Sequence, residues 1–289
     1  MAKVYLTYRD MQIISALERC PLTVRQLRAL SETFATIFGS DRRLQTRLAL
    51  LAEGGILHRY RYASTEGAGQ YYYTLSPDAY HLLHGGAEPL PSPGLFREIG
   101  IARQHHTKKL ADFIVHTQVA AHREGILVDN FARENTLKLT VGDEHLYPDC
   151  AFGLAAPERT PFTFYVELDN STEPLASPRE RDSWLRKLRF YESLQDRSPS
   201  RFRVLGIITR SPKRMENIAA LAASIAKNPL RSLFLGIYLP DYLQSPLPLT
   251  SPIFAGHNFL RVSLLPRATS TALTQIASML TPLAQPVAV

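Results

Sequence analysis

The sequence predicts a protein of the mixed α/β class, with a small helical domain followed by a larger domain built on a mixed sheet. Three observations lead to this prediction. Residues before position 84 combine helical apolar spacing with two strand-like runs. The segment His84–Gly94 holds three prolines and three glycines, which will not continue a helix or a central strand. Beyond it, strand-like and helical runs alternate, as in layered α/β domains.

Three helices are expected before residue 55. Their apolar residues recur at intervals that place them on buried helix faces. These residues are Met11, Ile14, Leu17, Leu22, Leu27, Leu30, Leu44, Leu48 and Leu51. Thr7, Thr23 and Ser40 stand where N-caps are expected, and Gly54-Gly55 would end the third helix.

Two strand-like runs, 56–64 and 69–76, follow around a turn at 65–69, and a short helix is expected at 77–83. This order is that of a winged helix, a helix-turn-helix variant whose third helix enters the DNA major groove. The candidate DNA contacts are polar residues that avoid the leucine face of the third helix, and two arginines that share one face of the next strand. They are Arg42, Arg43, Gln45, Thr46, Arg47, Arg59 and Arg61. The alternative is a solvated basic face on a domain that dimerises and does not bind DNA.

The second domain is expected to have the order helix, three strands, helix, strand, helix, strand. The predicted elements span 98–122, 125–131, 145–154, 162–168, 181–195, 201–209, 213–227 and 233–240. Because the connections between the first three strands are too short for crossover helices, these strands should be antiparallel. The predicted domains are 1–84 and 96–245, with a linker at 85–95 and a C-terminal extension at 246–289.

Three carboxylates stand in or at the ends of these strands. Asp149 follows Pro148 within the second strand, while Glu167 and Asp169 end the third. Residues two apart on a strand project to the same face, so that Glu167 and Asp169 should point together. If the two strands are neighbours, Asp149 can join them. Clustered carboxylates suit Mg²⁺ or Mn²⁺, which can polarise a phosphodiester and activate water.

The helix after the third strand carries a lysine near this cluster. Trp184, Leu188 and Tyr191 have the spacing of a stripe that packs on the sheet. Lys187 lies at the edge of that stripe, from which its ammonium could orient water and offset charge on a phosphate. The alternative for Lys187 is an ordinary surface lysine, and for the acids simple solvation or pairing with Arg179, Arg181 or Arg186.

The motifs resemble those of two related groups of proteins. Pro148-Asp149 followed by Glu167-x-Asp169 is similar to the PD…(D/E)xK signature of restriction-endonuclease-like nucleases, although Asp169 replaces the usual lysine. Some members of that superfamily carry the lysine on the next helix, where Lys187 stands. More narrowly, the order of motifs over about residues 5–210 resembles the replication-relaxation family of plasmid and mobile-element proteins. The matching residues are His106, Pro148, Asp149, Glu167, Asp169, Thr172, Glu173, Lys187 and Tyr191.

The resemblance implies a DNA-binding protein that serves replication, relaxation or mobilisation of plasmid or mobile-element DNA. If it cuts DNA, Asp149, Glu167 and Asp169 would hold Mg²⁺ or Mn²⁺ and Lys187 would position water, with His106 and Tyr191 as further site candidates. The alternative is a sequence-specific DNA-binding or replication-initiation protein whose nuclease-like domain is degenerate. A protein–protein module without DNA contact is a third interpretation.

Composition limits the remaining function classes. The 33 basic and 26 acidic residues give a net charge of +7, a surplus that favours polyanionic partners such as DNA. No apolar run approaches the roughly 18 residues of a membrane span, and no signal peptide is recognisable, so that a cytoplasmic protein is expected. Two cysteines, Cys20 and Cys150, make neither a disulfide framework nor a zinc site. A homodimer is compatible with both predicted folds.

Two other mechanisms are not favoured. A tyrosine relaxase needs a tyrosine beside a histidine metal site. Tyr71, Tyr72 and Tyr73 alternate along one strand and no such histidine triad accompanies them. ATP-driven work is not expected either, because the sequence has no glycine-rich GKS/T loop.

Overall fold

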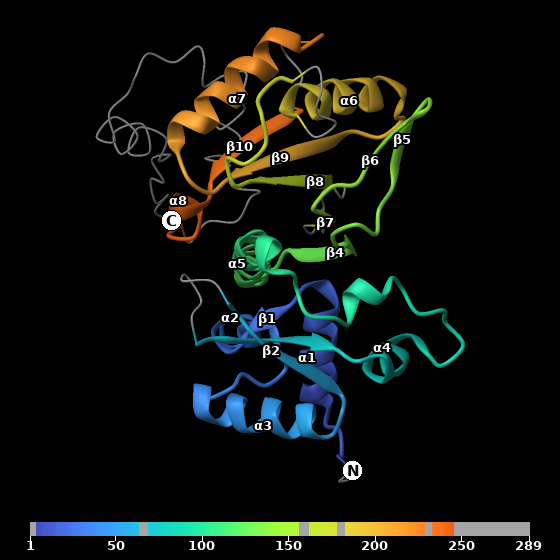
Figure 1. Cartoon of the computed structure of the whole chain (residues 1–289), viewed down its shortest axis with the longest axis vertical. Helices are drawn as coiled ribbons and strands as arrows, with labels where there is room; N and C mark the ends of the chain where they lie inside the picture. Colours follow the sequence, from blue (N-terminus) through green and yellow to red (C-terminus); the bar gives the residue numbers. More distant parts are fainter. Residues whose placement is uncertain (1–3, 64–68, 156–161, 178–182, 229–232, 246–289) are drawn as a thin grey trace, which may run out of the picture.

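The computed structural model describes residues 4–63, 69–155, 162–177, 183–228 and 233–245. Most of the turn expected at 65–69, the arginines Arg179 and Arg181, and nearly all of the C-terminal extension lie outside these ranges. The described part is a mixed α and β structure, as predicted (Figure 1).

The N-terminal unit consists of helices on a three-stranded antiparallel sheet. Its helices and strands are α1 (Tyr8–Arg19), β1 (Leu22–Thr23), α2 (Val24–Leu30), the 3₁₀ turn η1 (Ser31–Thr33), α3 (Asp41–Glu53), β2 (Leu57–Arg61), β3 (Tyr71–Leu75) and α4 (Pro77–His84). The three helices and the β2–β3 hairpin were predicted. The two-residue strand β1, which pairs with β3, was not.

The predicted caps of this unit are confirmed. The hydroxyls of Thr7 and Thr23 each accept a hydrogen bond from a backbone N–H three residues on, and both caps are completed by a reciprocal side chain, Asp10 and Gln26. Ser40 accepts from the N–H of Arg43. These contacts form within one helical turn, so that each helix begins at its cap.

The second unit is built on a five-stranded sheet. Its elements are η2 (Pro93–Leu95), α5 (Ile101–Arg123), β4 (Leu127–Ala132), β5 (Leu139–Val141), β6 (Glu144–Leu146), β7 (Cys150–Ala155), β8 (Phe162–Asp169), α6 (Trp184–Arg197), β9 (Phe202–Ile208), α7 (Pro212–Ile225), β10 (Phe234–Tyr238) and α8 (Leu239–Tyr242). The strand order is β10-β9-β8-β7-β4. Strands β4, β7 and β8 pair antiparallel, as expected, whereas β8, β9 and β10 are parallel.

One predicted strand of this unit was wrong. The run expected as a single strand over 145–154 forms two, because Tyr147, Pro148 and Asp149 interrupt it. The first part, β6, pairs with β5 in a separate hairpin that was not predicted, and the second part, β7, enters the main sheet. Asp149 therefore lies immediately before β7 and not within a strand.

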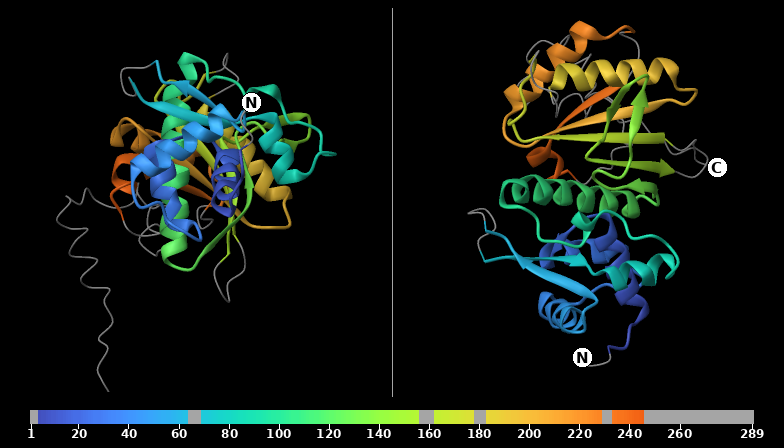
Figure 2. Two further views of the ribbon diagram at one scale, coloured as in Figure 1. Left: turned by 90° about the horizontal axis from the view of Figure 1, so that it is seen from below. Right: turned by 45° about the vertical axis from the view of Figure 1, so that its right-hand side comes forward.

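Helix α5 forms a layer shared by both units. It covers one face of the sheet, while α6 and α7 cover the other (Figures 1 and 2). The N-terminal unit packs on the opposite side of α5, where Gln26 Nε2 donates to Asp112 Oδ1 over 2.8 Å. Arg133, which follows β4, donates to the backbone oxygen of Glu18 at the end of α1. One hydrophobic cluster runs from Ile13 through Phe113 to Leu168, so that the two units share a core.

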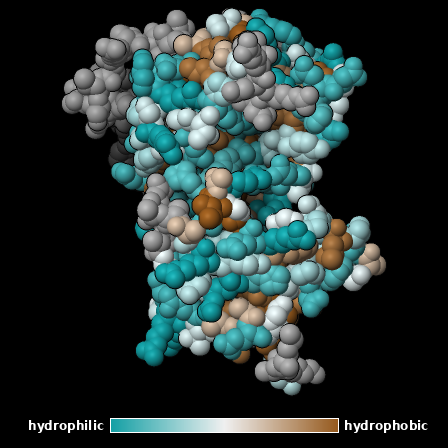
Figure 3. Space-filling model, in the orientation of Figure 1, coloured by the Kyte–Doolittle hydropathy of each residue, from teal (hydrophilic) through white to brown (hydrophobic). Residues whose placement is uncertain are grey.

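The surface is mainly hydrophilic on the face that Figure 3 shows, with apolar side chains in small separate groups. Among the described residues, no helix combines the length and the apolar character that crossing a membrane requires.

Candidate functional site

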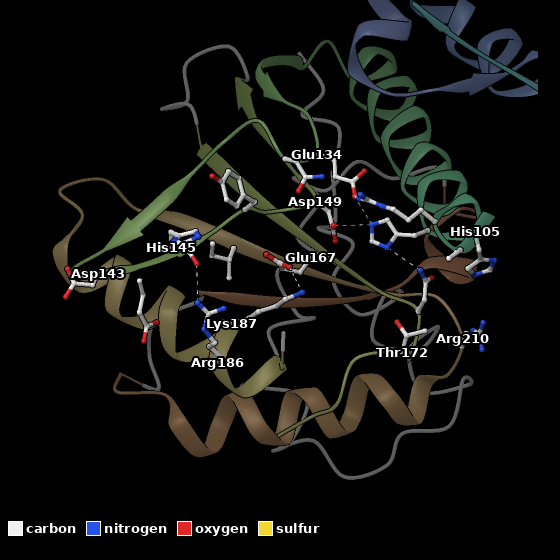
Figure 4. Close-up of a pocket in the computed structure, with 18 residues that line it drawn as sticks. His105, Glu134, Asp143, His145, Asp149, Glu167, Thr172, Arg186, Lys187 and Arg210 are labelled. Carbon is white, nitrogen blue, oxygen red and sulfur yellow. Dashed lines mark hydrogen bonds and ion pairs between the residues drawn. The ribbon is translucent and has the colours of Figure 1, made fainter. Parts of the chain in front are cut away.

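A cleft of about 800 Å³ opens at one end of the main sheet. Its walls come from the first half of α5, the segment after β4, the β5–β6 hairpin and the start of α6 (Figure 4). Asp149, Glu167, Lys187 and His106, which were predicted as site residues, all line it. The cleft thus brings together these four side chains, which are separated by up to 81 positions in the chain.

Asp149 is held at the centre of the cleft by two contacts. Its Oδ1 accepts a hydrogen bond from His106 Nε2 over 3.0 Å, and its Oδ2 accepts from the backbone N–H of Leu168 over 2.6 Å. Burial raises the pKa of Asp149, but the hydrogen bond and charge of His106 outweigh it and the net pKa is lowered. The carboxylate is therefore ionised at neutral pH and fixed in orientation.

Glu134 joins this pair from the segment after β4. Its Oε1 lies 3.8 Å from His106 Nε2, and it also pairs with Arg103 on α5. One ligand atom each of His106, Glu134 and Asp149 lies within 4.8 Å of the others, close enough to surround one cation. Glu134 was not predicted as a site residue, because an acid in an irregular segment has no periodicity or motif that distinguishes it.

The imidazole of His106 is positioned from both sides. Asn170 Nδ2, just after β8, lies 3.3 Å from Nδ1, while Nε2 faces Asp149. Burial lowers the pKa of His106. The hydrogen bond and charge of Asp149, together with the charge of Glu134, outweigh this effect, so that the net pKa is above the usual value. A proton and a metal cation would therefore compete for Nε2. Asn170, like Glu134, was not predicted as a site residue.

Glu167 lies deeper, on the side of the sheet that α6 covers. Its Oε1 accepts a hydrogen bond from Tyr191 Oη over 2.6 Å, and its Oε2 lies 2.9 Å from Lys187 Nζ. Burial is the largest influence and, with the charge of Asp149, raises the pKa of Glu167 to about 7. Tyr191 and Lys187 oppose this rise, so that Glu167 can both hold and release a proton near neutral pH.

Lys187 lies between two acids. Its Nζ is 2.9 Å from Glu167 Oε2 and donates to Glu173 Oε1 over 2.9 Å. Burial lowers the pKa of Lys187, but the two carboxylates outweigh it and hold the pKa above its ordinary value. The amine is therefore a fixed positive charge and not a base.

Asp169 is on the same face of β8 as Glu167, but it does not line the cleft. Its carboxylate is fully buried, where it accepts hydrogen bonds from Trp184 Nε1 and from Arg214, whose Nη2 lies 2.8 Å from Oδ2. The backbone N–H of Ser171 also donates to Oδ1. These contacts tie β8 to α6 and α7. Of the three predicted cation ligands, the cleft therefore contains Asp149 and Glu167 without Asp169.

A second group of predicted residues lies on α3, on the N-terminal unit (Figure 1). Leu44, Leu48 and Leu51 are buried, as predicted. The polar side chains on the opposite side are exposed, namely Arg42, Arg43, Gln45 and Thr46. A cleft beside this helix is lined by Arg42, Arg43, Thr46 and also Arg9 of α1. The arrangement leaves an open basic helix face.

Arg47 differs from its neighbours because it faces α1. Its Nε donates to Asp10 Oδ1 over 2.7 Å, and its Nη2 donates to Asp10 Oδ2 and to the backbone oxygen of Tyr5. Only 2% of the Asp10 side chain is exposed, compared with 23% for Arg47. Arg47 therefore anchors α3 to the capped end of α1.

Replacing Arg47 with methionine is expected to lower stability in a pH-dependent way. Burial raises the pKa of Asp10, but hydrogen bonds from Arg47 and Thr7 outweigh it and the net pKa is lowered. A lowered folded-state pKa stabilises the fold above the unfolded-state pKa, and this contribution is lost as the pH falls through the folded-state value. Arg47→Met should therefore cost about 3 kcal/mol at neutral pH, and much less once the pH is below the lowered folded-state pKa of Asp10, as measured by urea unfolding.

The control for this prediction is Arg43→Met, since Arg43 is exposed on the same helix. It should change stability by less than about 0.5 kcal/mol at either pH. An equal loss for Arg47→Met at neutral and acidic pH would contradict the role assigned to its charge.

The two predicted arginines of the hairpin are also exposed. Arg59 and Arg61 alternate with half-buried residues along β2 and so share one face, as strand geometry requires. The guanidinium of Arg59 lies 4.8 Å from the centre of the Tyr71 ring, which holds it against β3. These side chains extend the basic surface beyond α3.

Comparison with known protein families gives one match that covers most of the chain. A model of a family described as replication-relaxation matches residues 17–209. This range includes α3, the β2–β3 hairpin and every residue of the cleft named above. Neither a curated protein nor a solved structure matches the chain.

Proposed function

The chain belongs to the replication-relaxation family, and from this membership we propose that it is a DNA-binding protein of plasmid or mobile-element replication, relaxation or mobilisation that cleaves phosphodiesters with a divalent cation. The observation that supports cleavage is the convergence of Asp149, Glu167 and Lys187 in one cleft. Lys187 stands beside Glu167 although it comes from the next helix, so that the charge of the missing strand lysine is supplied from α6.

His106, Glu134 and Asp149 fit a cation better than the three acids taken from the sequence. They are half-buried, they approach one another closely, and two of them are carboxylates. One imidazole and two carboxylates suit Mn²⁺ more than Mg²⁺, which prefers oxygen ligands alone. The cation, when bound, would polarise a phosphodiester and lower the pKa of a bound water.

The other side chains of the cleft have roles that follow from their charges. Glu167, with a pKa of about 7, would accept a proton from the attacking water. Lys187 would offset the negative charge that grows on the phosphate. Tyr191 would orient the Glu167 carboxylate through its hydrogen bond and is a positioning residue.

The N-terminal unit would hold the DNA. Its order of helices and hairpin supports the winged-helix interpretation, in which α3 lies in the major groove and Arg59 and Arg61 follow the backbone. Arg42, Arg43, Gln45 and Thr46 would make the contacts of α3. Arg47 would position this helix through Asp10 and would not itself contact a base.

The test is incubation of the protein with supercoiled plasmid in Mg²⁺, Mn²⁺ or EDTA, for the wild type and for Glu167→Gln. This substitution keeps the size of the side chain but removes its ability to accept a proton as a carboxylate. We expect conversion to open-circle or linear DNA that requires the cation and is lost in the variant. Duplex binding in EDTA should be unchanged, because α3 lies outside the cleft.

The matched control is Asp143→Asn. It removes another acid that lines the same cleft but does not belong to the cation group, which consists of His106, Glu134 and Asp149. It should retain conversion. A second candidate function, DNA binding without cleavage, is favoured by the closed ion pairs of Lys187 with Glu167 and Glu173. A gel shift with no conversion in any cation would select this second function.

A further inference from the structure

The cleft has features that neither cation binding nor phosphate chemistry requires. Acidic side chains lie at its centre and, as Asp143 and Glu144, at the end formed by the β5–β6 hairpin, but an arginine stands at each end, Arg186 at one and Arg210 at the other. Figure 4 shows His145 and Arg186 on one side of Glu167 and Lys187, and His105 and Arg210 on the other. A polyanionic strand that crossed the cleft would meet positive charge where it enters and where it leaves.

The size of the cleft limits what can cross it. A volume of about 800 Å³ lies within the roughly 300–1,000 Å³ of pockets that enclose a small ligand. One or two nucleotides would fill it. The hairpin β5–β6 and the first half of α5 both contribute lining residues, so that the cleft is bounded on two sides.

An aromatic side chain lines the cleft beside Asp149. Tyr147 is 43% exposed, and the ring of His145 meets it edge to face with centroids 5.9 Å apart. Arg186 donates a hydrogen bond to the backbone oxygen of His145 over 3.2 Å, which ties the end of this hairpin to α6. The Tyr147 ring thus rests against His145, while much of its surface is open.

From these features we infer that the cleft takes a single strand of DNA, with one base stacked on Tyr147 and the flanking phosphates bound by Arg186 and Arg210. Stacking on an exposed aromatic ring within a basic groove is how proteins bind single strands without reading their sequence. Tyr147 precedes Asp149 by two residues, at most about 7 Å of chain. The phosphate next to the stacked base can therefore reach the proposed cation group of His106, Glu134 and Asp149. This inference rests on the proposed function and names its substrate.

The test measures binding of one fluorescein-labelled oligonucleotide by anisotropy in EDTA, as a single strand and annealed to its complement. Tyr147→Ala should weaken single-strand binding by about 10-fold and leave duplex binding unchanged. Tyr147→Phe, which keeps the ring, should bind as the wild type does. Arg210→Ala should reduce the dependence of single-strand affinity on salt by about one phosphate contact.

Two further variants separate this inference from the proposed function. Tyr8→Ala removes an exposed ring at the start of α1 and should change neither affinity. The double substitution of Arg42 and Arg43 by alanine should weaken duplex binding alone. The inference would be overturned if duplex binding depends on Arg42 and Arg43 while single-strand affinity is the same in Tyr147→Ala as in the wild type. The proposed function would then still stand. Absence of binding to either DNA would overturn both.

Discussion

Replacing Arg214 with methionine is expected to destabilise the protein by about 3–5 kcal/mol, because it leaves a buried carboxylate without its cation. The Asp169 side chain is completely buried and Arg214 is 14% exposed, with Arg214 Nη2 2.8 Å from Asp169 Oδ2. Trp184 and Ser171 would still donate hydrogen bonds, but they carry no charge. Urea unfolding followed by circular dichroism measures the loss, which is a large part of the roughly 5–15 kcal/mol that stabilises a typical domain.

Lys213 provides a matched comparison one residue earlier on α7. Its ion pair with Glu216 is exposed on both sides, and such pairs contribute little in water. Lys213→Met should therefore leave the unfolding midpoint almost unchanged. If the two substitutions had equal effects, the pair between Asp169 and Arg214 would not be the contact that holds β8 to α7.

Replacing Asp149 with asparagine is expected to weaken Mn²⁺ binding by at least about 100-fold. Loss of a residue that only hydrogen-bonds to a metal ligand already weakens metal binding by about 10- to 100-fold, and Asp149 would contact the cation directly. The substitution removes a ligand and also the charge that fixes the imidazole of His106. Calorimetric titration of the protein with Mn²⁺ measures the affinity without reference to cleavage. In the wild type the affinity should rise with pH, because the cation must displace the proton from His106.

The control for this titration is again Asp143→Asn, in which a nearby acid of the cleft is lost while the cation group is intact. Unchanged Mn²⁺ affinity in Asp149→Asn would mean that Asp149 serves only as the hydrogen-bond partner of His106. The same titration of Glu167→Gln would then show whether Glu167 holds the cation instead.

The sequence was most informative where structure depends on near neighbours. Thr7, Thr23 and Ser40 were recognised as caps because each bonds to a backbone group three residues away. The stripe of Trp184, Leu188 and Tyr191 was recognised because helical spacing alone places these residues on one face, and all three are buried. Apart from the β5–β6 hairpin, the order of the main strands and helices in the second unit followed from the same local patterns.

Which side chains surround Glu167 and Asp169 depends on contacts between elements that are distant in the chain. A single sequence does not reveal such contacts. Strand alternation placed Glu167 and Asp169 on one face, yet Tyr191 and Lys187 surround the first while Trp184 and Arg214 surround the second. The difference arises from where α6 and α7 cross β8. Glu134 reaches the cleft only because the segment after β4 folds back toward α5, and its local sequence gives no sign of this.

The sharing of α5 between the two units has a thermodynamic consequence. His106, near the beginning of this helix, faces the cleft, while Asp112, less than two turns later, is bonded to Gln26 of α2. A ligand that binds only the folded form stabilises every element that must be folded for binding. DNA held by α3 would therefore slow hydrogen exchange throughout α5, including the turn that carries His106. DNA binding at α3 would thus stabilise the folded form of the cleft around His106 through mass action. No movement of one unit against the other would be needed.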